Sequence, residues 1–302
     1  MTSRRILLIS SAALALTASM SGFAFADDKM PVVATFSILG DMVEQVGGDR
    51  ISVTTLVGPD GDAHVYEPTP ADAKAVAAAK VVFTNGFHFE GWMPKLFEAA
   101  EYKGPIVVAT TGLTPNRFIE DGVETDQDDP HAWQSLRNGH TYVVNITAGL
   151  IAADPAGADY YTQRSTDYLA QIDALDAEVK AAVQTIPEAN RIIVTSHDAF
   201  GYFGQEYGMK FLAPEGVSTE AEASAADVAK VIAEINTRQI PAVFMENITD
   251  PRLLEQITSE TKAKVGGKLF SDALSPPDGE GATYLDMFRH NITTFTAALG
   301  SS

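Results

Sequence analysis

Four side chains in this sequence have the chemistry of a metal site. His64 lies in GDAHVYEPTPAD, a loop after the predicted strand 51–57, and His131 lies in DPHAWQS, at the end of an acidic segment. His197 and Asp272 directly follow the predicted strands 191–195 and 268–270. In open α/β sheets, ligands bind beyond the carboxyl ends of the strands, which is where such residues emerge.

These four residues are divided equally between the two halves of the chain. His64 and His131 belong to the first half, and His197 and Asp272 belong to the second. If the halves face each other, three imidazoles and one carboxylate form a set of four N and O donors that zinc accepts in tetrahedral geometry. No compact H-x-x-x-H motif occurs, so spacing alone leaves an alternative in which each histidine is an ordinary polar loop residue.

The elements that must position these residues alternate between strand and helix, which predicts an α/β fold with mostly parallel sheets flanked by helices. The first half has this pattern, and a second copy of it begins at Arg191. The predicted strands are 31–36, 51–57, 80–84, 106–108, 191–195, 242–245 and 268–270. The predicted helices are 38–46, 71–79, 91–100, 200–207, 223–237, 251–261 and 284–298.

A long helix is predicted between the two halves. Apolar residues recur at spacings of three, four or seven between Pro155 and Pro187, and about 30 helical residues would span roughly 45 Å. We therefore expect an N-terminal lobe over residues 27–154, a linking helix over 155–187 and a C-terminal lobe over 188–302. The alternative is an ordinary surface helix within one domain.

Residues 114–130 form an acidic segment without a clear hydrophobic period. A solvated loop is expected there, and the gathering of cations is a second, alternative role.

The N-terminus has the pattern of an export signal. Arg4 and Arg5 precede an apolar run, and Ala24-Phe25-Ala26 matches a cleavage site, so residues 1–26 are expected to be a signal peptide, with an uncleaved anchor as the alternative. The chain has no cysteine, which excludes disulfides, thiolate metal ligands and a lipid-modified cysteine. A soluble periplasmic protein without a lipid anchor is expected. The net charge of -19 argues against binding to nucleic acid.

Five motifs together resemble those of a known family. GDAHVYEPTPAD, NGFHFEGW, DPHAWQS, TSHDAFGYF and FSDALSPPDGEGATYLDMFRHN resemble, in order and spacing, the substrate-binding proteins of zinc and manganese ABC importers (metal-binding cluster A-I). The resemblance implies two α/β lobes joined by a long backbone helix, with the metal between them and with His64, His131, His197 and Asp272 as ligands. It also implies delivery to an ABC permease at the inner membrane. We further expect a monomeric protein that is not an enzyme, and loading by a separate periplasmic metallochaperone is left open.

The third ligand position favours zinc over manganese. Many manganese-directed members have glutamate there, whereas this chain has His197, and imidazole suits zinc better than Mn²⁺. The C-terminal motif resembles manganese-type members equally well, and the His-rich loop and disulfide of many zinc members are absent. Zinc is the expected cargo and manganese is the alternative.

Two other functional classes are weighed against metal capture. A zinc hydrolase would use Asp272 as general base and keep a water on the metal, but no H-E-x-x-H helix occurs. A binder of organic solutes would need cleft aromatics, for which Trp133 and Phe87 are candidates, and a cleft arginine, which is not apparent.

The remaining polar residues of these motifs are given simpler roles. His88 is expected near the cleft, while His140 and His290 are interpreted as packing or surface residues. Ser196 or Asp198 is expected to cap the helix after His197, with Asp198 alternatively orienting the His197 ring.

Overall fold

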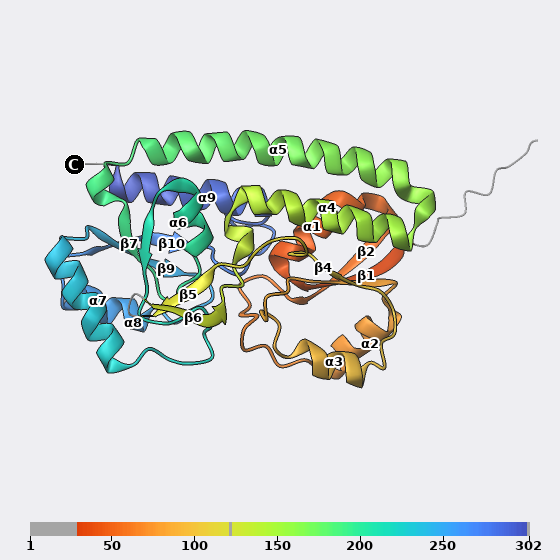
Figure 1. The fold of residues 1–302 in the computed structure, drawn as a ribbon, viewed down its shortest axis with the longest axis horizontal. Coiled ribbons are helices and arrows are strands. Elements are labelled where there is room, and N and C mark those ends of the chain that lie inside the picture. The colour runs from red at the N-terminus through yellow and green to blue at the C-terminus, as the bar shows by residue number, and fades with distance from the viewer. Residues whose placement is uncertain (1–28, 121–122, 301–302) are drawn as a thin grey trace, which may run out of the picture.

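The protein consists of two α/β lobes placed side by side, as the computed structural model shows for residues 29–120 and 123–300 (Figure 1). The predicted signal peptide lies outside the described residues. The first lobe has a parallel sheet in the order β2-β1-β3-β4. Its strands are β1 (Met30–Phe36), β2 (Ile51–Val57), β3 (Val81–Thr84) and β4 (Ile106–Val108). Its helices are α1 (Ser37–Gly47), α2 (Pro70–Ala78), α3 (Met93–Ala99) and α4 (Leu136–Ala153).

The second lobe repeats this plan with a parallel sheet in the order β10-β9-β7-β8. Its strands are β7 (Ile192–Val194), β8 (Lys210–Leu212), β9 (Ala242–Glu246) and β10 (Lys264–Leu269). Its helices are α6 (Gly201–Tyr207), α7 (Ala225–Arg238), α8 (Arg252–Ser259) and α9 (Tyr284–Leu299). The predicted fold class is confirmed, although β8 was not predicted.

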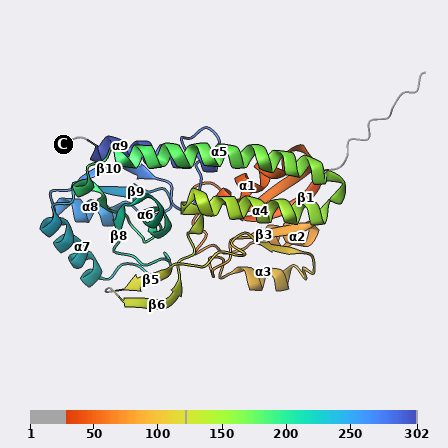
Figure 2. The same ribbon diagram turned by 45° about the horizontal axis from the view of Figure 1, so that its top comes forward.

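The long helix α5 (Ala158–Gln184) runs along one side of both lobes (Figures 1 and 2). Its 27 residues span about 40 Å. The predicted apolar stripe is its buried face, which includes Tyr168, Ile172 and Leu175. A 3-10 turn, Pro155–Gly157, precedes the helix, so the helix begins three residues later than predicted and ends before Pro187. No described helix has the length and apolar character needed to cross a membrane.

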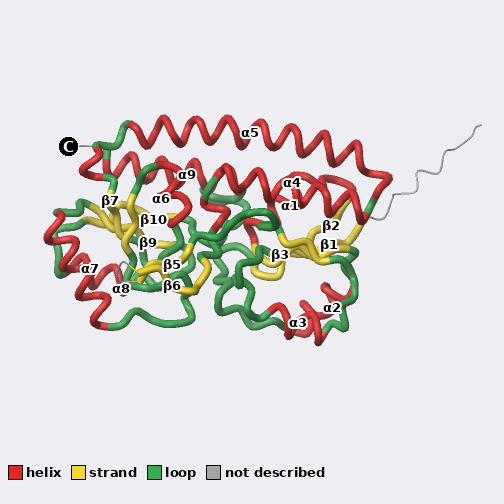
Figure 3. Tube along the Cα trace, in the orientation of Figure 1, coloured by secondary structure: helices red, strands yellow, loops and turns green. Residues whose placement is uncertain are grey.

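The prediction of a loop over residues 114–130 was wrong. This segment contains an antiparallel hairpin of β5 (Arg117–Glu120) and β6 (Val123–Asp128), which lies beside the second lobe (Figure 3). Both strands are largely exposed, so hydrophobic alternation, which marks strands with a buried face, is missing here. The hairpin is formed by backbone hydrogen bonds between β5 and β6, so the pattern of apolar residues in the sequence does not predict it.

A carboxylate from α1 contacts the first turn of α9 and so connects the two lobes. Asp41 Oδ2 accepts the backbone N–H of Tyr284 at 2.9 Å, and Asp41 Oδ1 accepts a hydrogen bond from the Gln45 amide at 3.0 Å. Burial raises the pKa of Asp41 to about 6, above the value near 3.9 expected in an unfolded chain. The folded protein therefore holds this proton more tightly than the unfolded chain does.

Replacing Asp41 should change how stability depends on pH. Because the native state binds the additional proton, wild-type stability should fall as pH rises from about 4 to about 6 by a contribution that Asp41→Asn lacks. Relative to wild type, Asp41→Asn should gain about 1–2 kcal/mol of unfolding free energy between pH 4 and pH 7. Urea denaturation of both proteins at each pH measures this gain, and an equal difference at the two pH values would contradict it.

Candidate metal centre

The structure brings His64, His131, His197 and Asp272 together. One potential ligand atom from each of them lies within 4.8 Å of all the others. His64 comes from the loop after β2, and His131 lies just after β6, whereas His197 and Asp272 follow β7 and β10 of the second lobe. His131, His197 and Asp272 are fully buried, and His64 is 7% exposed. Two donors from each lobe thus meet at the boundary between the lobes.

The spacing of the four donor atoms suits one small cation. Asp272 Oδ2 lies 3.1 Å from Nε2 of His64, 3.1 Å from Nε2 of His197 and 3.5 Å from Nε2 of His131. Nε2 of His64 lies 3.3 Å from Nε2 of His131. A tetrahedral zinc ion with bonds of about 2.0–2.1 Å has its donors roughly 3.3–3.4 Å apart. Among the described residues, Asp272 Oδ1 has no hydrogen-bond partner although it is buried, as expected of a carboxylate that faces a cation.

Burial and neighbouring charges determine the protonation of the cluster. Burial lowers the pKa of His64. Burial also opposes the charged forms of His131 and Asp272, but neighbouring groups of opposite charge outweigh burial for both side chains. The charges of Asp272 and Asp129 raise the pKa of His131 to about 9. The charges of His131 and His197 hold the pKa of Asp272 well below its usual value. His197 likewise has a pKa well above its usual value, since the charges of Glu246 and Asp272 outweigh burial. The site therefore attracts positive charge, which protons or a metal ion can supply.

Two further carboxylates orient the imidazoles. Asp129 Oδ1 lies 2.8 Å from Nδ1 of His131 and accepts the His131 backbone N–H at 3.0 Å. Glu246 Oε2 forms an ion pair with Nδ1 of His197 at 2.7 Å. Glu246 Oε1 accepts the backbone N–H groups of Ser196 and His197 at 2.7 and 3.0 Å. Both carboxylates favour the tautomer in which Nε2 is free to bind a metal.

Sequence reasoning missed Glu246, and the roles given to Ser196 and Asp198 were wrong. Helix α6 begins only at Gly201, and Phe200 precedes it without a side-chain cap, so neither Ser196 nor Asp198 caps it. The carboxylate beside the His197 ring is Glu246 rather than Asp198. A signal for Glu246 was present, because it ends β9, the neighbour of β7, and therefore lies at the same sheet edge as His197.

The other histidines lie outside the cluster. His88 is exposed, and its expected place near the cleft stays a prediction. His140 lies within α4 and pairs with Asp173 of α5 at 2.7 Å, and His290 Nε2 contacts the backbone oxygen of Lys268 at 2.8 Å. Their interpretation as packing or surface residues is consistent with these contacts.

Aromatic side chains pack against the histidines of the site. The Trp133 ring lies 5.2 Å from the His131 ring, and the Phe89 ring lies 4.8 Å from the His64 ring. Trp133 is fully buried, and its Nε1–H donates to the backbone oxygen of Ser271 at 2.9 Å. This holds Trp133 against the segment that carries Asp272. Trp133 is thus a buried support of the cluster rather than an exposed contact surface.

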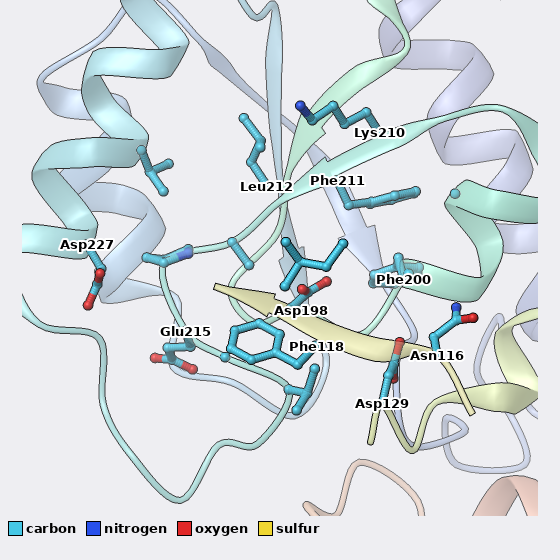
Figure 4. A pocket seen from close by; sticks show the side chains of 18 of the residues that line it. Asn116, Phe118, Asp129, Asp198, Phe200, Lys210, Phe211, Leu212, Glu215 and Asp227 are labelled. Carbon is cyan, nitrogen blue, oxygen red and sulfur yellow. The ribbon is translucent and has the colours of Figure 1, made fainter. Parts of the chain in front are cut away.

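A cavity of about 940 Å³ lies apart from the four donors, between the β5–β6 hairpin and the second lobe (Figure 4). Phe118, Phe200 and Phe211 line it together with Asp129 and Asp198. None of the four clustered side chains lines this cavity, although it is lined by Asp129, which contacts His131, and by Asp198, which follows His197 in the chain. We therefore place the chemistry in the small buried cluster and not in the large cavity.

Comparison with known proteins agrees with this geometry. Residues 32–298 match the family model described as zinc-uptake complex component A, periplasmic. The chain belongs to this family. It is 34% identical over 279 residues to the manganese-binding lipoprotein MntA of Bacillus subtilis, covering 91% of each chain.

Solved structures of relatives have the same fold. The periplasmic zinc-binding protein TroA of Treponema pallidum superimposes with a TM-score of 0.84 at 32% identity, over 90% of this chain and 99% of TroA. A manganese-bound periplasmic metal-binding protein of Candidatus Liberibacter asiaticus gives a TM-score of 0.81 at 32% identity, over 90% of this chain and 100% of that chain. The relatives thus include proteins named for different metals, while the solved structures share the fold of this chain.

The carboxylate beside His197 should matter for metal binding. Glu246→Gln keeps the size of the side chain but removes its charge, so metal affinity should fall by about tenfold to a hundredfold. Glu90→Gln is the matched control, because Glu90 is also a buried carboxylate that accepts backbone hydrogen bonds, yet it contacts none of the four clustered side chains. Titration with zinc in the presence of a competing chelator measures both, and an equal loss in the two variants would contradict an orienting role for Glu246.

Proposed function

We propose that this protein is a periplasmic binding protein that captures Zn²⁺ between its lobes and delivers it to an ABC permease. The observation that carries the proposal is the meeting of three imidazoles and one carboxylate, two donors from each lobe, at spacings that suit one ion. A metal held in this way would link the lobes and stabilise the closed form. The ion is the cargo of the protein.

Zinc is proposed because the donor set is rich in nitrogen. Divalent Mn²⁺ prefers carboxylate, carbonyl and water oxygens, and N/O sites generally bind zinc more tightly than manganese. Manganese is the second candidate on a specific observation: Asp272 Oδ1 is unpartnered among the described residues, so both carboxylate oxygens can bind one ion and raise its coordination number above four. The name of the B. subtilis relative supports the same alternative.

A binding role is favoured over a zinc hydrolase. Catalytic zinc sites keep one position for a reactive water, whereas four protein donors fill a tetrahedral sphere. Asp272 would have to act as the general base, but its Oδ2 lies 3.1 Å from Nε2 of His64 and of His197, as close as the imidazole nitrogens of His64 and His131 lie to each other.

We also propose that the protein is a monomer, with a metallochaperone as a further partner.

The cargo is tested by metal analysis in two arms. The purified protein should bind one equivalent of Zn²⁺ and should prefer it to Mn²⁺ by at least about a hundredfold in direct competition. Because such sites favour zinc in any mixture, protein taken from its native compartment must also be analysed for metal content. Zinc in that sample supports the proposal, and manganese overturns the zinc assignment. Absence of stoichiometric binding to either ion would overturn metal capture itself.

Removal of single ligands gives a second test. His64→Ala, His131→Ala and His197→Ala should each weaken zinc binding by more than about a hundredfold, exceeding the effect of an orienting residue. Asp272→Ala should weaken it less, because water can replace one carboxylate ligand. His140→Ala, which removes an imidazole on the surface of α4, is the control and should bind like wild type. Wild-type affinity in any of the three histidine variants would contradict the ligand set.

A further inference from the structure

The two histidines of the first lobe are held by the same local turn. In Asp62-Ala63-His64, Asp62 Oδ1 accepts the backbone N–H of His64 at 2.9 Å. In Asp129-Pro130-His131, Asp129 Oδ1 accepts the backbone N–H of His131 at 3.0 Å. Each aspartate therefore fixes the backbone of the histidine two residues later, and we call the two segments the D-x-H turns.

A hydroxyl group from the second lobe contacts each D-x-H turn. Thr219, in the loop between β8 and α7, donates from Oγ1 to Asp62 Oδ2 at 2.6 Å. Tyr202 of α6 donates from its hydroxyl to the backbone oxygen of Asp129 at 2.8 Å and accepts the backbone N–H of Asn116 at 2.9 Å. The placement of both N-terminal histidines is thus coupled to the second lobe by hydroxyl groups that touch none of the four donors.

The segment that carries Thr219 also contacts the strand end that carries His197. Residues 213–224 form the connection from β8 to α7, seen as the teal loop below the second lobe in Figure 1. The backbone N–H of Glu215 donates to the oxygen of Ser196 at 3.3 Å, and the N–H of Asp198 donates to the oxygen of Gly216 at 3.1 Å. One segment therefore holds the turn of His64 and the position of His197 at the same time.

We infer that Thr219 and Tyr202 are positioning residues that slow metal release. Opening of the lobes must break the Thr219–Asp62 and Tyr202–Asp129 hydrogen bonds, and while both persist the histidines of the first lobe remain aligned with His197 and Asp272. The inference rests on the proposed metal capture. It assigns the rate of release to side chains outside the ligand set.

The two contacts should differ in strength. Thr219 donates to a carboxylate oxygen, and hydrogen bonds to charged groups are stronger than those to neutral ones, so Thr219→Val should speed zinc release by about tenfold. Tyr202 donates to a backbone carbonyl, and Tyr202→Phe should speed release by about threefold. Zinc association should change less than release in both variants, because the four donors and the surface charge are retained.

The experiment measures zinc release from the full protein into excess chelator by stopped flow. Thr219→Val is compared with Thr219→Ser, which keeps the hydroxyl and should release zinc like wild type. Ser218→Ala is the matched control, because Ser218 lies in the same segment and, within the described part of the chain, its hydroxyl accepts from the N–H of Glu220 at 3.2 Å and forms no hydrogen bond with the first lobe. Faster release in Thr219→Val alone supports the inference, whereas equal rates in all four proteins overturn it.

A double-mutant cycle separates positioning from general weakening of the fold. In an Asp62→Ala background, Thr219→Val should have no further effect on release, since its partner is gone. An undiminished effect of Thr219→Val in that background would overturn the inference. The inference would also be overturned if the zinc release rates of the variants correlated with the unfolding midpoints of the same variants without metal. Failure of wild type to bind zinc would refute the proposed function instead, so the two failures are distinguishable.

Discussion

The buried carboxylate of Asp272 is the constraint on which the rest of the site depends. It has no solvent exposure, one of its oxygens faces three imidazole nitrogens, and the other has no hydrogen-bond partner among the described residues. Burying a carboxylate is strongly unfavourable unless positive charge or hydrogen bonds compensate it. The compensation comes from the imidazoles, as charged groups or as N–H donors, or from a metal ion, so the cluster has the chemistry of a cation site.

The same constraint explains why the site needs both lobes. Asp272 and His197 extend from one sheet, and His64 and His131 come from the other half, so the charge of Asp272 is compensated fully only when the lobes are in contact. Helix α5 spans both lobes and contacts elements of each, which makes it a stiff connection compared with a flexible linker. We infer that short interlobe contacts such as those of Thr219 and Tyr202 hold the closed form.

The strand-end positions of the site residues made much of this site predictable. His197 and Asp272 could be found because they follow buried strands, and parallel strands end at the same edge of a sheet. Glu246 also lies at the carboxyl end of a parallel strand, but it was not predicted. The sequence analysis singled out histidines at strand ends and did not consider a carboxylate that contacts one of them. The contacts of Thr219 with Asp62 and of Tyr202 with Asp129 could not be predicted from the sequence. The partners are separated by 157 positions in the first pair and by 73 positions in the second, and they meet through the packing of the lobes. The β5–β6 hairpin was missed for a different reason, its lack of a buried face.

X-ray absorption at the metal edge of the zinc-loaded protein tests the central claim most directly. Three nitrogen donors at about 2.0–2.1 Å and one or two carboxylate oxygens are predicted, with the imidazole signal reduced by one in each single histidine variant that still holds metal. A first shell dominated by water or other oxygens, or one unchanged in all three histidine variants, would contradict the account.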